Sequence, residues 1–313
     1  MKLRFAADAR TLLWAFVLFP GVAALVYAKP EWAVFCIPLS LYTGFCSGVL
    51  AHYHNHCPVF EDRRANALYA IWISMFYGYP IFAWVPTHNM NHHKFVNGPG
   101  DATITWRYTK KDTLLSAITY FFVSTYWQAG LIKTYIKKAR ASNARQFRQI
   151  VAQYASVLLA QGGVLALAVH LRGLRVGLVT YLCSFGATAA MGLWGMMFIN
   201  YIQHVHCDPS SDYDHSRNFV GPVANWLVFN SGYHTAHHEV AGAHWSTLPD
   251  LHQSIAGKID PELNQPSVAG YLFKAYALGR VRRKFLPRQV GRPAYAASVR
   301  AIAAPAYADL AAE

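Results

Sequence analysis

The stretch FCSGVLAHYHNH, residues 45–56, joins an apolar segment to three closely spaced histidines and decides how the rest of the chain is interpreted. Its apolar part belongs to the run Glu31–Ala51, which is close to the roughly 20 residues that a helix needs to cross a bilayer. A preceding apolar run, Thr11–Ala28, is separated from it only by Lys29-Pro30. The two runs predict a transmembrane helical hairpin that ends with histidines at the membrane surface.

Two later apolar runs predict a second hairpin. Ile150–Val169 and Val176–Ile199 are joined by a short turn, Leu171–Arg175. Lys and Arg are concentrated between the hairpins and after the second one, so the positive-inside rule places these segments in the cytoplasm. We therefore expect about four spans and a cytosolic helical cap. The spans are residues 11–28, 31–51, 150–169 and 176–199, and the cap comprises residues 52–149 and 200–313.

The remaining apolar runs are interrupted. Asn66–Val85 contains Gly and Pro, and Leu114–Ile132 is rich in polar residues, so we interpret both as interfacial or half-inserted helices. Thr11–Ala28 could alternatively be a cleaved signal peptide, but we favour an uncleaved span. In both cases residue 52 emerges on the cytoplasmic side. The predicted fold is an all-α, multi-pass membrane protein with a single domain over residues 1–313.

The composition agrees with a membrane protein. Hydrophobic residues make up 54% of the 313 residues and charged residues only 14%, against about 25% in typical soluble domains. Lys and Arg number 28 against 15 Asp and Glu, a formal net charge of +13. Because the basic residues flank apolar runs, they suit anionic membrane lipid or an acidic protein, and we expect no nucleic-acid partner. The five scattered cysteines are interpreted as packing residues in a reducing compartment.

Eleven of the fifteen histidines occur in four tight groups. On a helix, residues three or four apart share one face, so His52 with His56, and His88 with His92, should direct their imidazoles to the same side. His234 should do so with His237 and His238. The four solitary histidines are interpreted as structural. The groups are residues 52–56, 88–93, 200–206 and 234–238, and the solitary histidines are His170, His215, His244 and His252.

So many imidazoles predict a metal site. Neutral imidazole is a common metal ligand, and a dozen rings on one face would be costly if they were protonated together. A single tetrahedral zinc uses at most four protein ligands and would leave many histidines unused, whereas two metal ions would use them. Ferritin-like di-iron proteins bind their metal through Glu and Glu-x-x-His motifs, which this sequence lacks.

The four motifs HxxxH, HxxxHH, NxxxH and HxxHH, which we term the first to fourth histidine boxes, occur in this order. They resemble the integral-membrane fatty acid desaturase and hydroxylase superfamily, from about His52 to Leu251. The resemblance implies nine histidines that hold two irons and one asparagine that reaches iron through water. His54 and His206 are extra to the pattern, and we interpret them as supporting residues. The implied ligands are His52, His56, His88, His92, His93, His204, His234, His237 and His238, with Asn200 as the water-mediated contact.

Three acidic residues lie next to the boxes. Asp101, Asp208 and Glu239 could accept hydrogen bonds from ring N–H groups, as carboxylates around metal sites usually do. Alternatively, they are solvated loop acids.

The resemblance also implies a reaction and its partners. It implies oxidation of a fatty acyl chain, with O2 as co-substrate, at the cytoplasmic face of the membrane. A separate electron donor, such as a ferredoxin or a cytochrome b5-type protein, is implied because the chain shows no heme or iron–sulfur domain. Basic segments at Lys133–Arg148 and Arg280–Lys284 are candidate docks for an acidic donor.

Several reactions fit this chemistry. The stretches Asn230–Tyr233 and His244–Pro249 favour a desaturase, with hydroxylation or decarboxylation to a terminal alkene as alternatives. A membrane metal transporter would need ionisable residues inside the spans, which are nearly free of them. A zinc hydrolase is a further alternative that metal analysis would distinguish.

Overall fold

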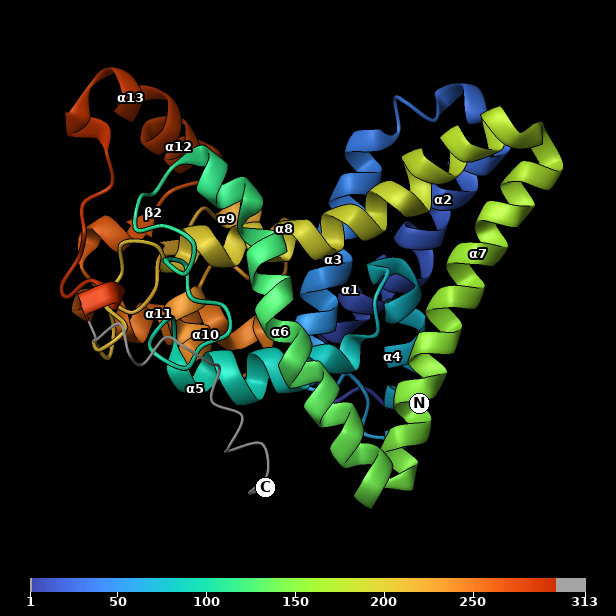
Figure 1. Cartoon of the computed structure of the whole chain (residues 1–313), viewed down its shortest axis with the longest axis horizontal. Coiled ribbons are helices and arrows are strands. Elements are labelled where there is room, and N and C mark those ends of the chain that lie inside the picture. The colour runs from blue at the N-terminus through green and yellow to red at the C-terminus, as the bar shows by residue number, and fades with distance from the viewer. Residues whose placement is uncertain (1, 297–313) are drawn as a thin grey trace. The chain divides into compact units, whose positions relative to one another are not determined.

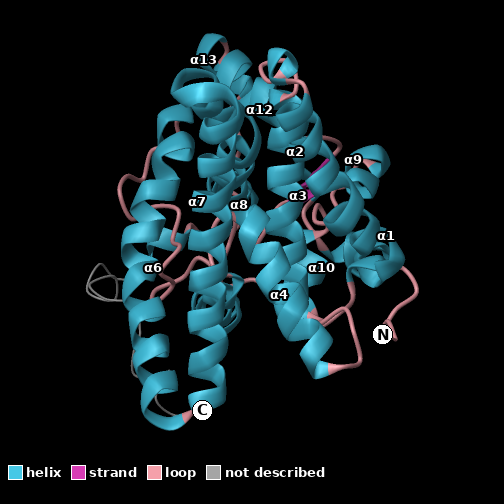
Figure 2. Ribbon diagram, turned by 90° about the vertical axis from the view of Figure 1, so that its right-hand side faces the viewer, coloured by secondary structure: helices cyan, strands magenta, loops and turns pink. Residues whose placement is uncertain are grey.

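The computed structural model describes residues 2–296, and helices account for most of them (Figure 2). Within this range the strands are β1 (Asn218–Phe219) and β2 (Asn264–Gln265), which pair in parallel. The predominantly helical fold expected from the sequence is therefore confirmed. The predicted cap extends to residue 313, and its last part, residues 297–313, lies outside the described residues.

The chain forms two compact units. Unit 1 comprises the residues up to Trp84 together with Ile136–Met196, and unit 2 comprises Val85–Tyr135 and the residues from Met197 onward.

The N-terminal apolar run of unit 1 forms one helical stretch of 21 residues, Asp8–Ala28. Pro20 lies at the start of its last part, and the wider π-helical turn before it accommodates a residue that lacks an N–H. Helix α3 (Ile37–His56) begins six residues later than the predicted run, after a 3₁₀ turn at Pro30–Trp32. The stretch consists of α1 (Asp8–Leu13), the π-helical turn Trp14–Leu18 and α2 (Phe19–Ala28).

Glycines bring α3 close to the first part of α8 (Ala187–His204). A Cβ on Gly44 would lie 2.3 Å from the carbonyl oxygen of Thr188, and one on Gly48 would lie 2.4 Å from Cγ of Met196. Residues 44, 48, 52 and 56 follow one another at four-residue spacing and therefore lie along one side of α3. The close contact thus fixes the orientation of the side that carries the first histidine box.

The helix before the second histidine box is broken. Helix α4 (Arg63–Tyr77) ends at Gly78, whose φ of 77° lies in the left-handed region, and the chain continues as a 3₁₀ turn, Ile81–Ala83. A break leaves backbone N–H groups without helical partners. The N–H of Phe82 donates to Oε1 of Gln153 over 3.0 Å, so a buried side chain of another helix supports the break.

Helix α7 (Ala144–Tyr181) contains the turn that was predicted at Leu171–Arg175. Gly173 has φ 73° and ψ 167° there and separates two helical segments, and Figure 1 shows the chain turning at this point. A Cβ on Gly177 would lie 2.6 Å from the backbone of Val169, so the two segments pack closely next to the turn. A π-helical turn, Leu182–Gly186, leads into α8.

Two helical stretches are long and apolar enough to cross a membrane, Asp8–Ala28 and Ala144–His204. A third would be added if the bent pair Arg63–Tyr77 and Ile81–Phe95 counted as one span. The expected apolar spans are thus present in part, and the total of four membrane spans stays a prediction.

Unit 2 has an aromatic core around the last part of α8. Tyr201 and Ile202 are buried together with Tyr120, Phe219 and Tyr271. This core holds the end of α8, where His204 lies. The helices of the unit include the π-helical segment Val85–His92, α5 (His93–Phe95), the first part of α6 (Leu114–Ser142), α9 (Pro222–Leu227), α10 (His234–Glu239), α11 (Leu248–Ile255), α12 (Val268–Leu272) and α13 (Gly279–Val281).

Candidate metal centre

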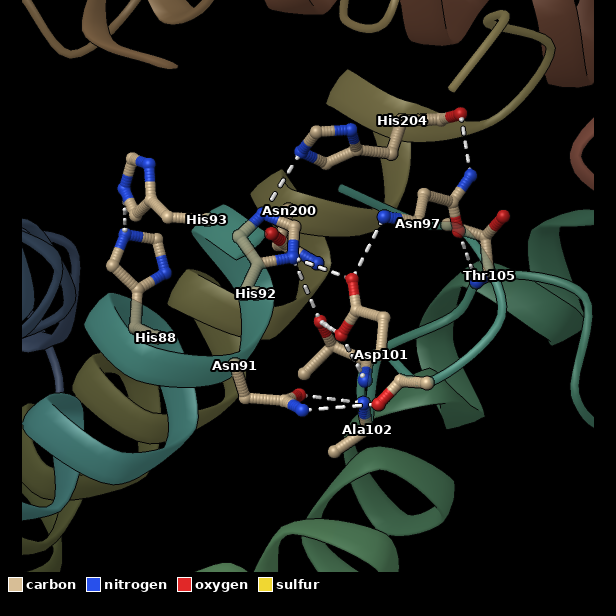
Figure 3. Close-up of polar contacts among 12 residues, drawn as sticks. His88, Asn91, His92, His93, Asn97, Asp101, Ala102, Thr105, Asn200 and His204 are labelled. Atoms are coloured by element: carbon tan, nitrogen blue, oxygen red, sulfur yellow. Dashed lines mark hydrogen bonds and ion pairs between the residues drawn. The ribbon is translucent and has the colours of Figure 1, made fainter. Parts of the chain in front are cut away.

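The second histidine box lies on the π-helical segment that continues into α5. Because a π-helix has a wider turn than an α-helix, residues five apart can face the same side. Nε2 of His88 lies 3.0 Å from Nε2 of His93, whereas His92 reaches toward His204 (Figure 3). The α-helical spacing in the sequence predicts that His88 and His92 face the same side. Their rings are neighbours, with centroids 5.1 Å apart, but their nitrogens join different groups.

His92, His204, His234 and His238 form what we term the four-histidine cluster, in which one nitrogen from each ring lies within 4.8 Å of the others. Nε2 of His204 is 3.1 Å from that of His92 and 2.9 Å from that of His234. Nε2 of His238 is 3.2 Å from that of His234. Two nitrogens bound at about 2.1 Å to one ion lie about 3.0–3.4 Å apart. The spacing therefore matches that of ligands sharing a metal.

Hydrogen bonds at Nδ1 determine which nitrogen carries the lone pair in two of these rings. Nδ1 of His92 lies 2.8 Å from Oδ2 of Asp101, and Nδ1 of His204 lies 3.1 Å from the carbonyl oxygen of His215. Carboxylate and carbonyl oxygens only accept, so in the neutral rings the proton sits on Nδ1 and Nε2 presents a lone pair. Two facing lone pairs repel each other unless a cation lies between them. The cluster therefore fits a metal ion.

Asp101 is fully buried beside the cluster, and four donors surround its carboxylate. Besides His92, it accepts from the N–H of Asn97 at 2.8 Å and from the N–H and Oγ1 of Thr103 at 2.6 and 2.7 Å. Burial by itself would raise the pKa of Asp101, but His92 and Thr103 outweigh it and hold this pKa below its usual value. The acid is therefore ionised at neutral pH, and its predicted bond to a ring N–H is confirmed.

Asn97 supports the same region from the other side. Its Nδ2 donates to the carbonyl oxygen of His204 at 3.1 Å, and its Oδ1 accepts from the N–H of Thr105 at 2.8 Å (Figure 3). Asn97 is buried and has a φ of 62°, a conformation that asparagine adopts more readily than most residues. This role of Asn97 was not predicted from the sequence, although the Asn97-Gly98 pair is a common turn signal.

His88, His93 and His237 form a second group. Nε2 of His93 lies 3.0 Å from Nε2 of both other rings. One ring N–H can donate along only one of these contacts, whereas a shared cation would satisfy both. The rings of His93 and His238 have centroids 4.4 Å apart, so this group adjoins the four-histidine cluster. Burial and then His93 hold the pKa of His238 well below its usual value, so this ring is neutral at pH 7 and can bind metal.

The first box lies in unit 1, on the last turns of α3. The rings of His52 and His56 have centroids 4.9 Å apart, as their spacing predicts. His54 points elsewhere, with Nε2 3.2 Å from the carbonyl oxygen of Asn66, which agrees with a supporting role. Metal ligation by His52 and His56 stays a prediction.

The third box contributes His204 to the cluster and positions two further residues. Asn200, one turn earlier on α8, donates from Nδ2 to the hydroxyl of Tyr120 at 3.0 Å, and its water-mediated contact to iron stays a prediction. Nε2 of His206 lies 3.0 Å from Oδ2 of Asp112. The structure thus gives His206 an acidic partner that the sequence spacing did not indicate.

His215 was interpreted as structural, yet it contacts the cluster. Its carbonyl accepts from His204, and its ring centroid lies 5.2 Å from that of His238. Burial, followed by the nearby His92, lowers the pKa of His215 to about 4. No short motif surrounds His215, so only the folded chain reveals this contact.

The other two box-adjacent acids differ from Asp101. Oε1 of Glu239 lies 3.4 Å from Nε2 of His215, a ring outside the implied ligand set. Asp208 accepts from the backbone N–H groups of Ser210 and Arg292, which is typical of a loop acid. Of the three acids, Asp101 therefore has the contact to an implied ligand.

The fold and the site together define a helical protein with long apolar helices and buried histidine groups that could bind metal. Comparison with protein families gives a match to the family described as fatty acid desaturase over residues 30–267. The match covers most of the chain, and the protein belongs to this family. A comparison with curated proteins found no match. Membership suggests a membrane-associated oxidoreductase and implies a fatty acyl substrate.

Proposed function

We propose that the protein catalyses the O2-dependent desaturation of a fatty acyl chain at a di-iron centre. The observation that carries this proposal is the pair of Nε2 lone pairs on His92 and His204, which face each other over 3.1 Å because Asp101 and the His215 carbonyl hold the Nδ1 protons. Seven of the nine implied histidine ligands belong to unit 2 and form two adjoining groups there. One tetrahedral zinc would not use all seven.

The proposed ligand set follows the family resemblance. It comprises the four-histidine cluster, the group of His88, His93 and His237, and the first-box residues His52 and His56. Asn200 completes it through a water molecule. Apart from the Asn200 amide, all the proposed donor atoms are neutral imidazole nitrogens. Imidazole suits iron among other transition metals.

The residues around the ligands prepare the site for metal. A bound iron pair would supply the oxidising power needed to remove hydrogen from an unactivated hydrocarbon. Asp101 orients His92, and Asn97 and His215 hold the backbone and ring of His204, so these rings are oriented before metal binds. Such supporting contacts favour metal binding because less ordering is required of the ligands.

Desaturation requires an outside source of electrons. One O2 is reduced to two waters, with two hydrogen atoms taken from neighbouring carbons of the acyl chain and two electrons and two protons supplied from elsewhere. All five cysteines are free, and four of them are buried, so they resemble packing residues more than cluster ligands. We therefore propose a separate donor, such as a ferredoxin or a cytochrome b5-type protein.

A multi-pass membrane location agrees with the exposed surface of α7. Leu158 and Leu159 are 72% and 75% exposed, and apolar side chains at such positions suit contact with lipid. We propose four spans with the histidine boxes on the cytoplasmic side, where the positive charge is concentrated.

Product analysis and metal analysis test the proposal together. The chain would be expressed in a host with a ferredoxin partner, and total fatty acids would be examined by mass spectrometry. We expect products that are lighter by two hydrogens and about two irons per purified chain, and neither in a His237→Ala variant. A gain of one oxygen would indicate hydroxylation, and a shortened terminal alkene would indicate decarboxylation. A single zinc without any oxidised product would refute the proposal.

A further inference from the structure

Unit 2 contains a groove of about 250 Å³ near its C-terminal end, which we term the basic groove. Lys274, Lys284 and Arg288 line it, together with Tyr271 and Glu262 among others. Residues 260–290 include six basic residues and two acidic ones, Glu262 and Asp260, which pairs with Arg288 at 2.9 Å, so their net charge is 6 − 2, or +4. Lys274 and Lys284 are exposed. The surroundings of the groove therefore carry a net positive charge. The six basic residues are Lys274, Arg280, Arg282, Arg283, Lys284 and Arg288.

Contacts within the core of unit 2 connect this groove to the helix that carries His204. The ring of Tyr271, which forms part of the groove wall, lies 4.5 Å from the guanidinium carbon of Arg217. Arg217 is buried, and its Nη1 donates to the carbonyl oxygen of Ile202, two residues before His204 on α8. One ring stack, one hydrogen bond and a short length of backbone thus join the groove to an implied iron ligand.

We propose that the basic groove is the docking site of an acidic one-electron carrier protein. The proposal rests on the proposed function, which requires such a donor. A carboxylate side chain of the carrier would enter the groove between Lys274 and Lys284. Redox partners bind through small, transient interfaces, for which charge complementarity raises the association rate. The positive field around the groove supplies this complementarity.

The groove is favoured over the other basic segment, Lys133–Arg148, by its place in the fold. That segment forms the junction of α6 and α7 and belongs mostly to unit 1. The groove belongs to unit 2, which contains seven of the nine implied histidine ligands. A carrier docked there would face the core that holds the end of α8.

Binding of a plant-type [2Fe–2S] ferredoxin, an acidic carrier, tests the proposal on the detergent-solubilised full chain. Thermophoresis would give the Kd at low and high ionic strength for the wild type, for a Lys274→Glu/Lys284→Glu variant and for a matched Lys133→Glu/Lys137→Glu control. All four residues are exposed, and both variants change the net charge equally. We expect the groove variant to weaken binding at least tenfold and to lose most of the salt dependence, and the control to stay within twofold.

Three outcomes would overturn the docking site. The first is that the groove variant binds ferredoxin as tightly as the wild type, and the second is that the control variant loses as much ferredoxin affinity as the groove variant. The third is that the groove variant binds ferredoxin normally but no longer binds phosphatidylglycerol vesicles, which would make the groove a lipid contact. The measurement needs no turnover and would be made with metal-free and iron-loaded protein. If the wild type makes no oxidised product but the groove variant still loses ferredoxin binding, the proposed function alone would be wrong. If the groove variant keeps normal iron content, normal product formation and normal ferredoxin binding, the docking site alone would be wrong.

Discussion

Nδ1 of His92 lies 2.8 Å from a carboxylate oxygen of Asp101, and both residues are almost completely shielded from solvent. The contact keeps the proton of His92 on Nδ1 and directs the lone pair of Nε2 into the four-histidine cluster. Carboxylates that bond to ligating imidazoles orient these rings, and losing one typically weakens metal binding measurably. Asp101 therefore provides a direct test of whether the cluster binds metal.

Replacing Asp101 with Asn should weaken metal binding about 10- to 100-fold. The amide keeps the shape of the side chain but removes its charge, so it holds the Nδ1 proton of His92 less firmly. Competition with a graded series of chelators would measure the affinity. Asp208→Asn is the control, because Asp208 bonds to backbone N–H groups of its own loop and of Arg292. Equal affinities in the two variants would show that Asp101 does not support a metal ligand.

At Asn97 a Gly replacement should be more stable than an Ala replacement, the reverse of the usual order. Both changes remove its bonds to the carbonyl of His204 and the N–H of Thr105, at a cost of about 1–3 kcal/mol for groups left unsatisfied. At a φ of 62°, Ala adds about 1–2 kcal/mol of backbone strain that Gly avoids. Thermal unfolding in detergent should therefore rank the wild type above Asn97→Gly and Asn97→Ala lowest. A more stable Ala variant would contradict this account.

The histidine groups could be recognised from sequence because their chemistry repeats at short spacing. His234 with His238 follows α-helical geometry, and their Nε2 atoms lie 3.2 Å apart as the spacing predicts. The pairing of His88 with His93 did not follow, because it depends on a π-helical turn that local residue preferences do not specify. The sequence therefore predicted the ligand set better than the way its members pair.

Supporting contacts were less predictable because they join distant parts of the chain. Asp101 could be identified, since it lies nine residues after His92 in the loop that follows the box. The bond from Asn97 to His204 spans 107 residues, and that from His206 to Asp112 spans 94. Such pairs depend on the three-dimensional path of the backbone. The same reason explains why the role of Gln153 at the break after α4 could not be foreseen.

Replacing Gln153 with Leu should destabilise the break that precedes the second histidine box. Oε1 of Gln153 accepts from the N–H of Phe82 at 3.0 Å, and Leu would leave this buried donor unsatisfied at a cost of about 1–3 kcal/mol. A lower thermal unfolding temperature would report the loss. Gln149→Leu is a suitable control, because Gln149 lies on the same helix but is exposed. Equal melting of the two variants would argue that Phe82 finds another acceptor.

The two glycines of α3 should differ in whether a second substitution can restore the stability that their replacement by Ala removes. Gly44→Ala would place its methyl group 2.3 Å from the carbonyl oxygen of Thr188, a backbone atom that cannot move without displacing α8. Gly48→Ala would collide with the side chain of Met196, so Met196→Ala in the same chain should make room for it. We expect both single variants to unfold at lower temperature and only the Gly48 variant to be rescued by Met196→Ala.

A third glycine shows what the same substitution does without a steric obstacle. Gly162 lies within α7, and a Cβ there would meet no atom within 4 Å, so Gly162→Ala should stabilise the chain by up to about 1 kcal/mol. Thermal unfolding and iron content would be measured in parallel for all the variants. Because residues 44 and 48 lie along the side of α3 that carries His52 and His56, Gly44→Ala should also lower the iron bound per chain, whereas Gly162→Ala should leave it unchanged. Full iron content in a folded Gly44→Ala variant would mean that the approach of α3 to α8 does not position the first histidine box.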